Sequence, residues 1–271
     1  MKPGWLKYLL VITPLFLFGP NGEGHAAPSH SVSPIQFSVF HLKQSTDPKG
    51  GVDIDYSLAW PVSGAPAPVL KTIRRKVVAL FLSGAEIRAP KEAVTDPQRL
   101  LARAAEAFAA PFKAFRKDFP DSAPGWEDNR KLSVTFQRSG ILTLTLDQFY
   151  FSGGAHPNGG LLHRVLDTRS GDDLVVMSIF KRGVESRLTT LIKREIRKKW
   201  KLPAGASLDK QGFWENQIKP ENVYVSSSGV GFTYNAYDIA PYVMGPTDIV
   251  IPYPALSSLL NPNSPVKELA R

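Results

Sequence analysis

The chain of 271 residues contains no cysteine, which excludes disulfides, thiolate nucleophiles and cysteine-ligated metals. It also has neither an HExxH zinc motif nor a GxSxG nucleophile elbow. After residue 27, no apolar run approaches the about 20 residues that a membrane-spanning helix needs. Stability must therefore come from packing, and the sequence carries no common catalytic signature.

Residues 1–27 have the features of a secretory signal peptide. Lys2 and Lys7 form a basic start, a short apolar run covers residues 9–18, and small residues follow near Ala26. The run is too short to span a bilayer, although retention as an N-terminal anchor is the alternative. We therefore predict a periplasmic or secreted protein whose mature chain has no transmembrane span.

The net charge is strongly positive. It is +9 for the whole chain and +8 once Lys2, Lys7 and Glu23 leave with the signal peptide. Such a charge favours anionic partners, and export points to membrane head groups or anionic wall polymers and argues against nucleic acid. Residues 184–201 carry many of the cations on a predicted amphipathic helix, which either packs its apolar face in the core or lies on a polyanion or membrane surface.

Periodicity predicts strands and helices in the first half of the chain. Residues 31–43 and 52–60 alternate as strands of a hairpin, and residues 69–82 have helical spacing. Asp96 is placed to cap a second helix that starts with Pro97, and Pro111 is expected to kink or end it.

Residues 132–136 and 141–151 form a second predicted hairpin. Pairing Phe136 with Leu142 leaves residues 138–140 as a three-residue loop. The remaining expected strands cover residues 161–166, 174–177, 223–225, 231–234 and 249–253. We predict an α+β fold of antiparallel sheets with packed helices, in two intimate subdomains of residues 28–125 and 126–262, followed by a tail of residues 263–271.

A glycine-rich loop follows the strand of residues 141–151 and carries His156. Its four glycines allow positive φ values and a close approach of other chain segments, which indicates a loop selected for its shape and not for catalysis. A zinc site needs three or four converging ligands, and His156 and His163 have no such set around them. We predict no catalytic residue, metal or cofactor, and expect the His156 ring to brace the loop by hydrogen bonding. The alternative is a peptidoglycan hydrolase or esterase that uses His156 with a nearby carboxylate.

A second loop, residues 235–246, combines aromatic residues with prolines. Tyr237 and Tyr242 are typical anchors of protein recognition, and Pro241 lowers the entropy cost of presenting them. The alternative is that both tyrosines pack on a neighbouring helix.

Residues 150–159, 167–180 and 235–256 together resemble the RsiV-like envelope domain, and the similarity covers about residues 145–260. That family includes the outer part of a lysozyme-sensing anti-sigma factor and the N-terminal portion of certain peptidoglycan deacetylases. The resemblance implies a non-enzymatic α+β module whose loops occupy the substrate cleft of a lysozyme-type muramidase. We expect neither a cytoplasmic sigma-binding part nor a retained membrane span, and therefore no signalling, and we expect no deacetylase domain.

The resemblance places Ser152 and His156 on the first loop and Tyr237, Pro241 and Tyr242 on the second. With their neighbours, the candidate binding residues are Ser152, Gly153, Gly154, His156, Asn158, Tyr237, Pro241 and Tyr242. We predict an exported module that binds or inhibits a lysozyme-like muramidase or senses the wall. Because animal lysozyme is itself basic, a more acidic wall hydrolase or an anionic wall polymer is the other expected partner.

Overall fold

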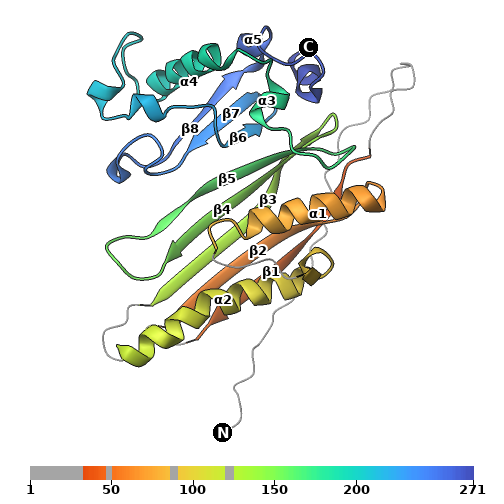
Figure 1. Cartoon of the computed structure of the whole chain (residues 1–271), viewed down its shortest axis with the longest axis vertical. Helices are drawn as coiled ribbons and strands as arrows, with labels where there is room; N and C mark the ends of the chain where they lie inside the picture. The colour runs from red at the N-terminus through yellow and green to blue at the C-terminus, as the bar shows by residue number, and fades with distance from the viewer. Residues whose placement is uncertain (1–32, 47–50, 86–90, 120–124) are drawn as a thin grey trace.

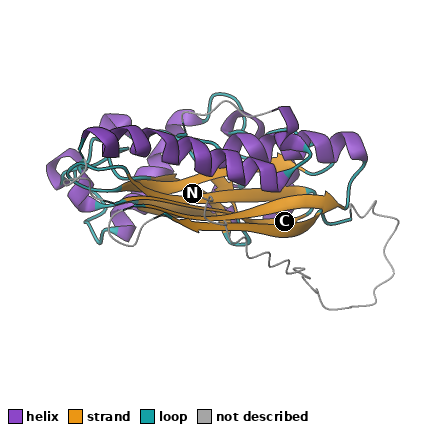
Figure 2. Ribbon diagram, turned by 90° about the horizontal axis from the view of Figure 1, so that it is seen from below, coloured by secondary structure: helices purple, strands orange, loops and turns teal. Residues whose placement is uncertain are grey.

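Two β-sheets and a layer of helices make up the described chain, which comprises residues 33–46, 51–85, 91–119 and 125–271 of a computed structural model. One sheet has five strands in the order β1-β2-β3-β4-β5, and the other has three in the order β6-β7-β8. The second sheet lies beyond β5, and the long helices gather on one side of the strands (Figures 1 and 2). The predicted α+β class is confirmed. Within the described residues, no helix is long and apolar enough to cross a membrane.

The strands and helices have the following bounds. The strands are β1 Gln36–Ser45, β2 Val52–Ser63, β3 Trp126–Arg138, β4 Ile141–Phe151, β5 Asn158–Asp167, β6 Val223–Val225, β7 Gly229–Tyr234 and β8 Thr247–Pro252. The α-helices are α1 Ala67–Phe81, α2 Pro97–Asp118, α3 Val176–Ile179, α4 Glu185–Lys199 and α5 Tyr253–Leu256.

The first sheet is antiparallel except where β2 runs parallel to β3. A parallel pair needs a long crossover, and the segment with α1 and α2 supplies it. Tyr56, Leu58 and their alternate neighbours on β2 are buried with the apolar faces of both helices in a first core. This sheet draws strands from both sides of residue 125, where the sequence suggested a subdomain boundary.

The basic helix α4 belongs to a second core. Its apolar side chains Leu188, Ile192 and Ile196 are fully buried, and the helix packs against β8. On its outer face, Lys193 forms an ion pair with Glu215 at 3.0 Å. The segment is therefore a core helix with a solvated face, as the first of the two alternatives proposed.

The β3-β4 hairpin differs from the expected one. Arg138 pairs with Ile141, so the turn has only two residues, Ser139 and Gly140, both with positive φ. A two-residue turn with both φ values positive has a backbone twist that matches the twist of the flanking strands. A register shift next to Thr135 then turns Phe136 away from the helices, where it contacts the second core.

Of the two outcomes expected at Pro111, a kink or an end, the end does not occur: helix α2 continues to Asp118, and the proline lies on an exposed part of the helix. The cap at its start is as predicted, since Asp96 accepts a hydrogen bond from the Arg99 backbone at 2.9 Å. Residues 174–177 do not form a strand, because the chain enters the short helix α3 at Val176.

Two asparagine side chains join the second sheet to the edge of β5. Asn235 Oδ1 accepts from the Leu161 backbone N–H at 2.8 Å, and its amide donates back to the Leu161 carbonyl at 3.0 Å. Asn222 accepts from the His163 N–H at 3.0 Å and donates to the Leu161 and Thr233 carbonyls. These side-chain amides, called the asparagine clasp below, replace the partner strand that the β5 edge lacks.

Replacing Asn222 with alanine tests the clasp. The change removes three hydrogen bonds to buried or half-buried backbone and leaves alanine at a φ of 46°. We expect the free energy of unfolding to fall by about 2–4 kcal/mol, measured by urea denaturation. The exposed Asn216 provides the matched control, Asn216→Ala, which is expected to change stability little. Equal stability of the two variants would contradict a structural role for the clasp.

Candidate functional site

The glycine loop and the loop of residues 235–246 meet through three aromatic rings. The rings of His156 and Tyr242 stack with centroids 4.1 Å apart, and Tyr237 lies 5.5 Å from Tyr242. Tyr237 Oη lies 3.3 Å from His156 Nε2, and Tyr242 donates to the Pro157 carbonyl at 3.2 Å. These three residues, called the aromatic cluster, join segments about 80 residues apart in the sequence.

Local backbone bonds set the shape of the second loop. Asp238 accepts from the Asn235 backbone N–H at 2.7 Å, and Tyr237 takes a φ of 72°. Burial and then the nearby charge of Glu221 raise the pKa of Asp238 against the lowering effect of that bond. A single helical turn at residues 242–244 leaves Val243 at the tip, 91% exposed.

The other predicted binding residues surround the cluster or lie beyond it. Gly153 and Gly154 both have positive φ, which explains the glycines there. Asn158 starts β5 and is exposed, as is Pro241. Ser152 belongs to a different neighbourhood: it lines a cavity against β3 and α2 and takes no part in the aromatic cluster.

The His156 ring bonds to the residue that follows it and to the second loop, whereas the sequence suggested a bond within the glycine loop. Its Nδ1 lies 2.9 Å from the Pro157 carbonyl oxygen, and its other ring nitrogen faces Tyr237. Neither nitrogen contacts a carboxylate in the described part of the chain. Likewise, no group of three or more histidine and acidic residues that could hold a metal ion occurs within the described residues.

A chain of polar side chains that sequence reasoning missed crosses from one sheet to the other. Thr145 Oγ1 lies 2.9 Å from His163 Nδ1, and His163 Nε2 lies 2.9 Å from Thr233 Oγ1. Thr233 in turn donates to Asp248 Oδ1 at 2.6 Å, and Tyr224 donates to the other carboxylate oxygen. The local sequence around His163 does not indicate this chain of hydrogen bonds, because strand register and sheet packing bring the histidine to its partners.

The hydrogen bonds of this chain define the tautomer of His163. Because the Thr233 hydroxyl donates to Asp248, its oxygen accepts from His163 Nε2–H. Nδ1 is then the acceptor for the Thr145 hydroxyl, so the neutral imidazole satisfies both bonds. Burial lowers the pKa of His163 from 6.5 to about 4, against the opposing effect of Asp248.

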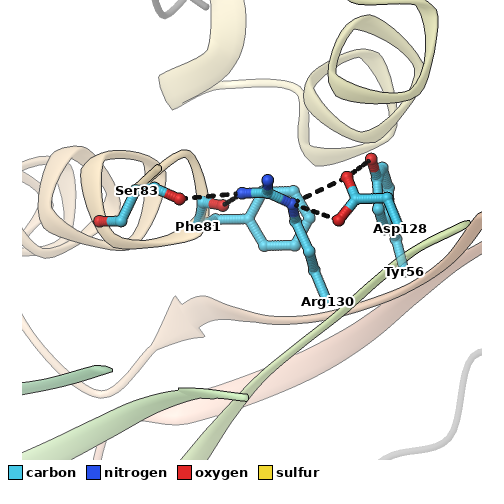
Figure 3. A network of polar contacts seen from close by, with 5 residues as sticks. All are labelled: Tyr56, Phe81, Ser83, Asp128 and Arg130. Atoms are coloured by element: carbon cyan, nitrogen blue, oxygen red, sulfur yellow. Dashed lines mark hydrogen bonds and ion pairs between the residues drawn. The ribbon is translucent and has the colours of Figure 1, made fainter. Parts of the chain in front are cut away.

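A second polar network lies under the helices of the first sheet (Figure 3). Arg130 Nε binds both carboxylate oxygens of Asp128 at 3.0 and 3.1 Å, and Tyr56 donates to the same carboxylate. Arg130 Nη1 donates to the carbonyls of Phe81 and Ser83 and so closes the end of α1. Burial, followed by the Asp128 charge, raises the pKa of Tyr56.

The fold places the chain among two-layer α+β proteins. Comparison with known families adds a match to one part of the chain. A family described as "Protein of unknown function (DUF3298)" matches residues 177–254. That region contains the second loop and excludes the glycine loop. The resemblance to the RsiV-like family stays a prediction, with which these matches do not conflict. No curated protein sequence matches the chain.

Two solved structures share the fold. A DUF3298 family member from Bacteroides fragilis matches with a TM-score of 0.70 and 20% identity, covering 89% of this chain and 98% of that one. A DUF3298 family protein from Pseudomonas aeruginosa matches with a TM-score of 0.59 and 20% identity, covering 86% and 97%. At this identity the likeness establishes the fold alone.

His163 predicts a specific pH dependence of stability. Its folded pKa of about 4 lies below the ordinary 6.5, so the unfolded chain binds the proton more strongly. The stabilisation is complete above about pH 6.5 and is lost as the pH falls toward about 4. Between about pH 7 and pH 4.5 this group should remove about 2–3 kcal/mol from the free energy of unfolding, as urea denaturation would measure.

The matched variants are His163→Gln and His41→Gln, since His41 is exposed on β1. Glutamine at position 163 should flatten the loss between the two pH values, whereas the His41 variant should behave like the parent protein. The same acid loss in all three proteins would show that other groups carry it.

Proposed function

We propose that the aromatic cluster and the tip at Val243 form a protein-recognition surface that binds a lysozyme-type peptidoglycan hydrolase and blocks its substrate cleft. The observation that carries this proposal is the exposure of large side chains on a braced loop. Tyr237 is 51% and Tyr242 37% exposed although both rings are fixed by neighbours. Exposed aromatic side chains held in place bind at low entropy cost.

The surface has the shape that suits insertion into a cleft. Val243 is exposed on a single helical turn that also carries Tyr242, whose ring stacks on His156. The bond from Tyr242 to the Pro157 carbonyl ties the projecting loop to the glycine loop. A partner therefore meets a preformed ridge with an apolar tip, which favours a concave protein surface over a flat one.

Local charge reduces the long-range repulsion expected between two basic proteins. Asp238 and Glu221 are exposed beside the second loop, and Glu221 is close enough to raise the pKa of Asp238. These two carboxylates attract a basic hydrolase at short range in spite of the net charge, which is +8 without residues 1–27. Muramidases of the lysozyme type are thus compatible partners for this face.

The hydrolase alternative has less support from the geometry. A catalytic histidine needs a carboxylate or a nucleophile within hydrogen-bonding reach. His156 instead contacts a backbone carbonyl and two tyrosine rings within the described chain. Binding without turnover is therefore the function that these residues favour.

The test measures binding to a purified lysozyme-type muramidase by isothermal titration calorimetry and inhibition of wall lysis by turbidity. We expect Tyr242→Ala and Val243→Asp each to weaken binding at least about tenfold, because the first removes a stacked anchor and the second places a charge at the apolar tip. Val175→Asp is the matched control, since Val175 is an exposed valine on a different segment, before α3.

Loss of binding in both loop variants with full binding of the Val175 variant would support the proposal. The proposal fails if the parent protein neither binds the muramidase nor slows lysis. Equal weakening by all three variants would also count against it, since the effect would then not depend on the two loops.

A further inference from the structure

Three cationic side chains from different segments converge on the turn that follows α5. Lys181 Nζ donates to the Ser258 carbonyl at 2.9 Å, and Lys267 Nζ donates to the Ser257 carbonyl at 2.9 Å. Arg187 Nη2 donates to Ser258 Oγ at 3.4 Å. These three side chains are called the cationic cluster below. They surround two consecutive residues at the end of the molecule where α5 lies between α4 and the C-terminus (Figure 1).

Buried backbone contacts fix the distance between the turn and the segment that carries Lys181. The Lys181 N–H donates to the Leu259 carbonyl at 2.9 Å. Directly beside this bond, Phe180 and Leu260 pair in a β-bridge, and both belong to the second core with exposed fractions of 2% and 1%. The core therefore holds this part of the cluster in place, and the exposed side chains do not have to.

The cluster has no anionic partner in the described part of the chain. None of its three cations forms an ion pair with a described carboxylate. By contrast, most other basic residues of α4 are paired with Glu195 or Glu215, namely Lys193, Arg194, Arg197 and Lys198. Positive charge is thus partly compensated on the outer face of α4 but not at the turn after α5.

The acidic residues next to Arg187 and Lys267 in the sequence face other groups. Glu185 precedes Arg187 by two residues, which places it on the opposite side of α4, where it lines a groove with Thr189. The charge of Glu268 acts on Arg169. The three positive charges of the cluster therefore repel one another without a described carboxylate between them.

Each cation keeps hydrogen-bond donors beyond the one that holds it in place. An ammonium has three N–H donors and a guanidinium has five, and each side chain of the cluster uses one of them in its bond to the turn. The Ser258 hydroxyl accepts from Arg187 and donates to no described residue, whereas the Ser257 hydroxyl donates to the Pro254 carbonyl at 3.1 Å. Charged donors from three segments and one hydroxyl group are thus available to a ligand.

We propose that the cationic cluster binds a phosphate monoester group, carried by a membrane lipid or by a soluble molecule. Such a group has about two negative charges at pH 7 and three acceptor oxygens, so it neutralises most of the cluster and gives each cation an oxygen to bind. A carboxylate or a phosphodiester carries a single charge and neutralises less. The proposal is independent of muramidase binding, because it concerns other residues and needs no protein partner.

The test measures binding of the full protein at about 150 mM salt. The probes are glycerol phosphate, followed by isothermal titration calorimetry, and vesicles of equal parts phosphatidylcholine and phosphatidic acid, followed by co-sedimentation. Vesicles in which phosphatidylglycerol, a phosphodiester, replaces phosphatidic acid are the control. We expect at least one monoester to bind, and binding of only one of the two identifies the source. Failure of both monoesters to bind, or binding of the diester vesicles as tightly as the tighter monoester, overturns the proposal.

Two double variants separate the cluster from a general effect of charge. Lys181→Gln with Lys267→Gln removes two charges but keeps amide donors for the two serine carbonyls, and it should weaken binding at least about tenfold. The matched control is Lys199→Gln with Lys210→Gln, because both lysines are exposed and the change in net charge is the same. With native circular dichroism in both proteins, equal weakening by the two double variants, or unchanged binding by the first, would also overturn the proposal.

Discussion

The closure of the β5 edge by Asn222 and Asn235 is the interaction on which the rest of this architecture depends. A sheet edge exposes unpaired backbone groups that would accept another strand. Here side-chain amides from the second sheet occupy them at Leu161 and His163. Because side chains and not a strand bind the β5 edge, the second sheet does not have to be coplanar with the first. The two sheets therefore lie side by side and stay separate. Gly160 allows this approach, since a Cβ there would lie 2.3 Å from Asn235 Oδ1.

The clasp also explains why the two loops converge. Asn235, which bonds to Leu161, is the first residue of the second loop. Residues 158–160, just before Leu161 on β5, directly follow the glycine-loop residues that carry His156. Once the edge is clasped, His156 and Tyr242 have little freedom to separate. The neutral His163 adds a second junction through Thr233, with a hydrogen-bond direction that a charged ring would break. The recognition surface is thus a consequence of sheet docking.

Sequence patterns predicted those elements whose cause is local. The alternation in residues 52–60 and the Asp96 cap specify β2 and the start of α2 without distant partners. Predictions were wrong where contacts between distant segments determine the local structure. At Thr135, for example, a bulge directs Phe136 into the second core. The contacts of His156 with Tyr237 and Tyr242 depend on a distant loop, and the buried pair of Asp128 and Arg130 looks like any alternating polar pair in a strand. Its burial depends on helices contributed by other segments.

The glycine loop connects the cavity that Ser152 lines with the aromatic cluster, and this gives its composition a physical reason. At one end, Gly153 has a φ of 89° and a Cβ there would lie 3.8 Å from Trp126 Nε1. At the other end, His156 stacks on Tyr242 three residues later. A Cβ at that distance would make an ordinary contact with the indole, so the backbone conformation and not a lack of space requires glycine at 153. The loop therefore owes its glycine at this point to the turn by which the chain leaves the cavity and reaches the aromatic cluster.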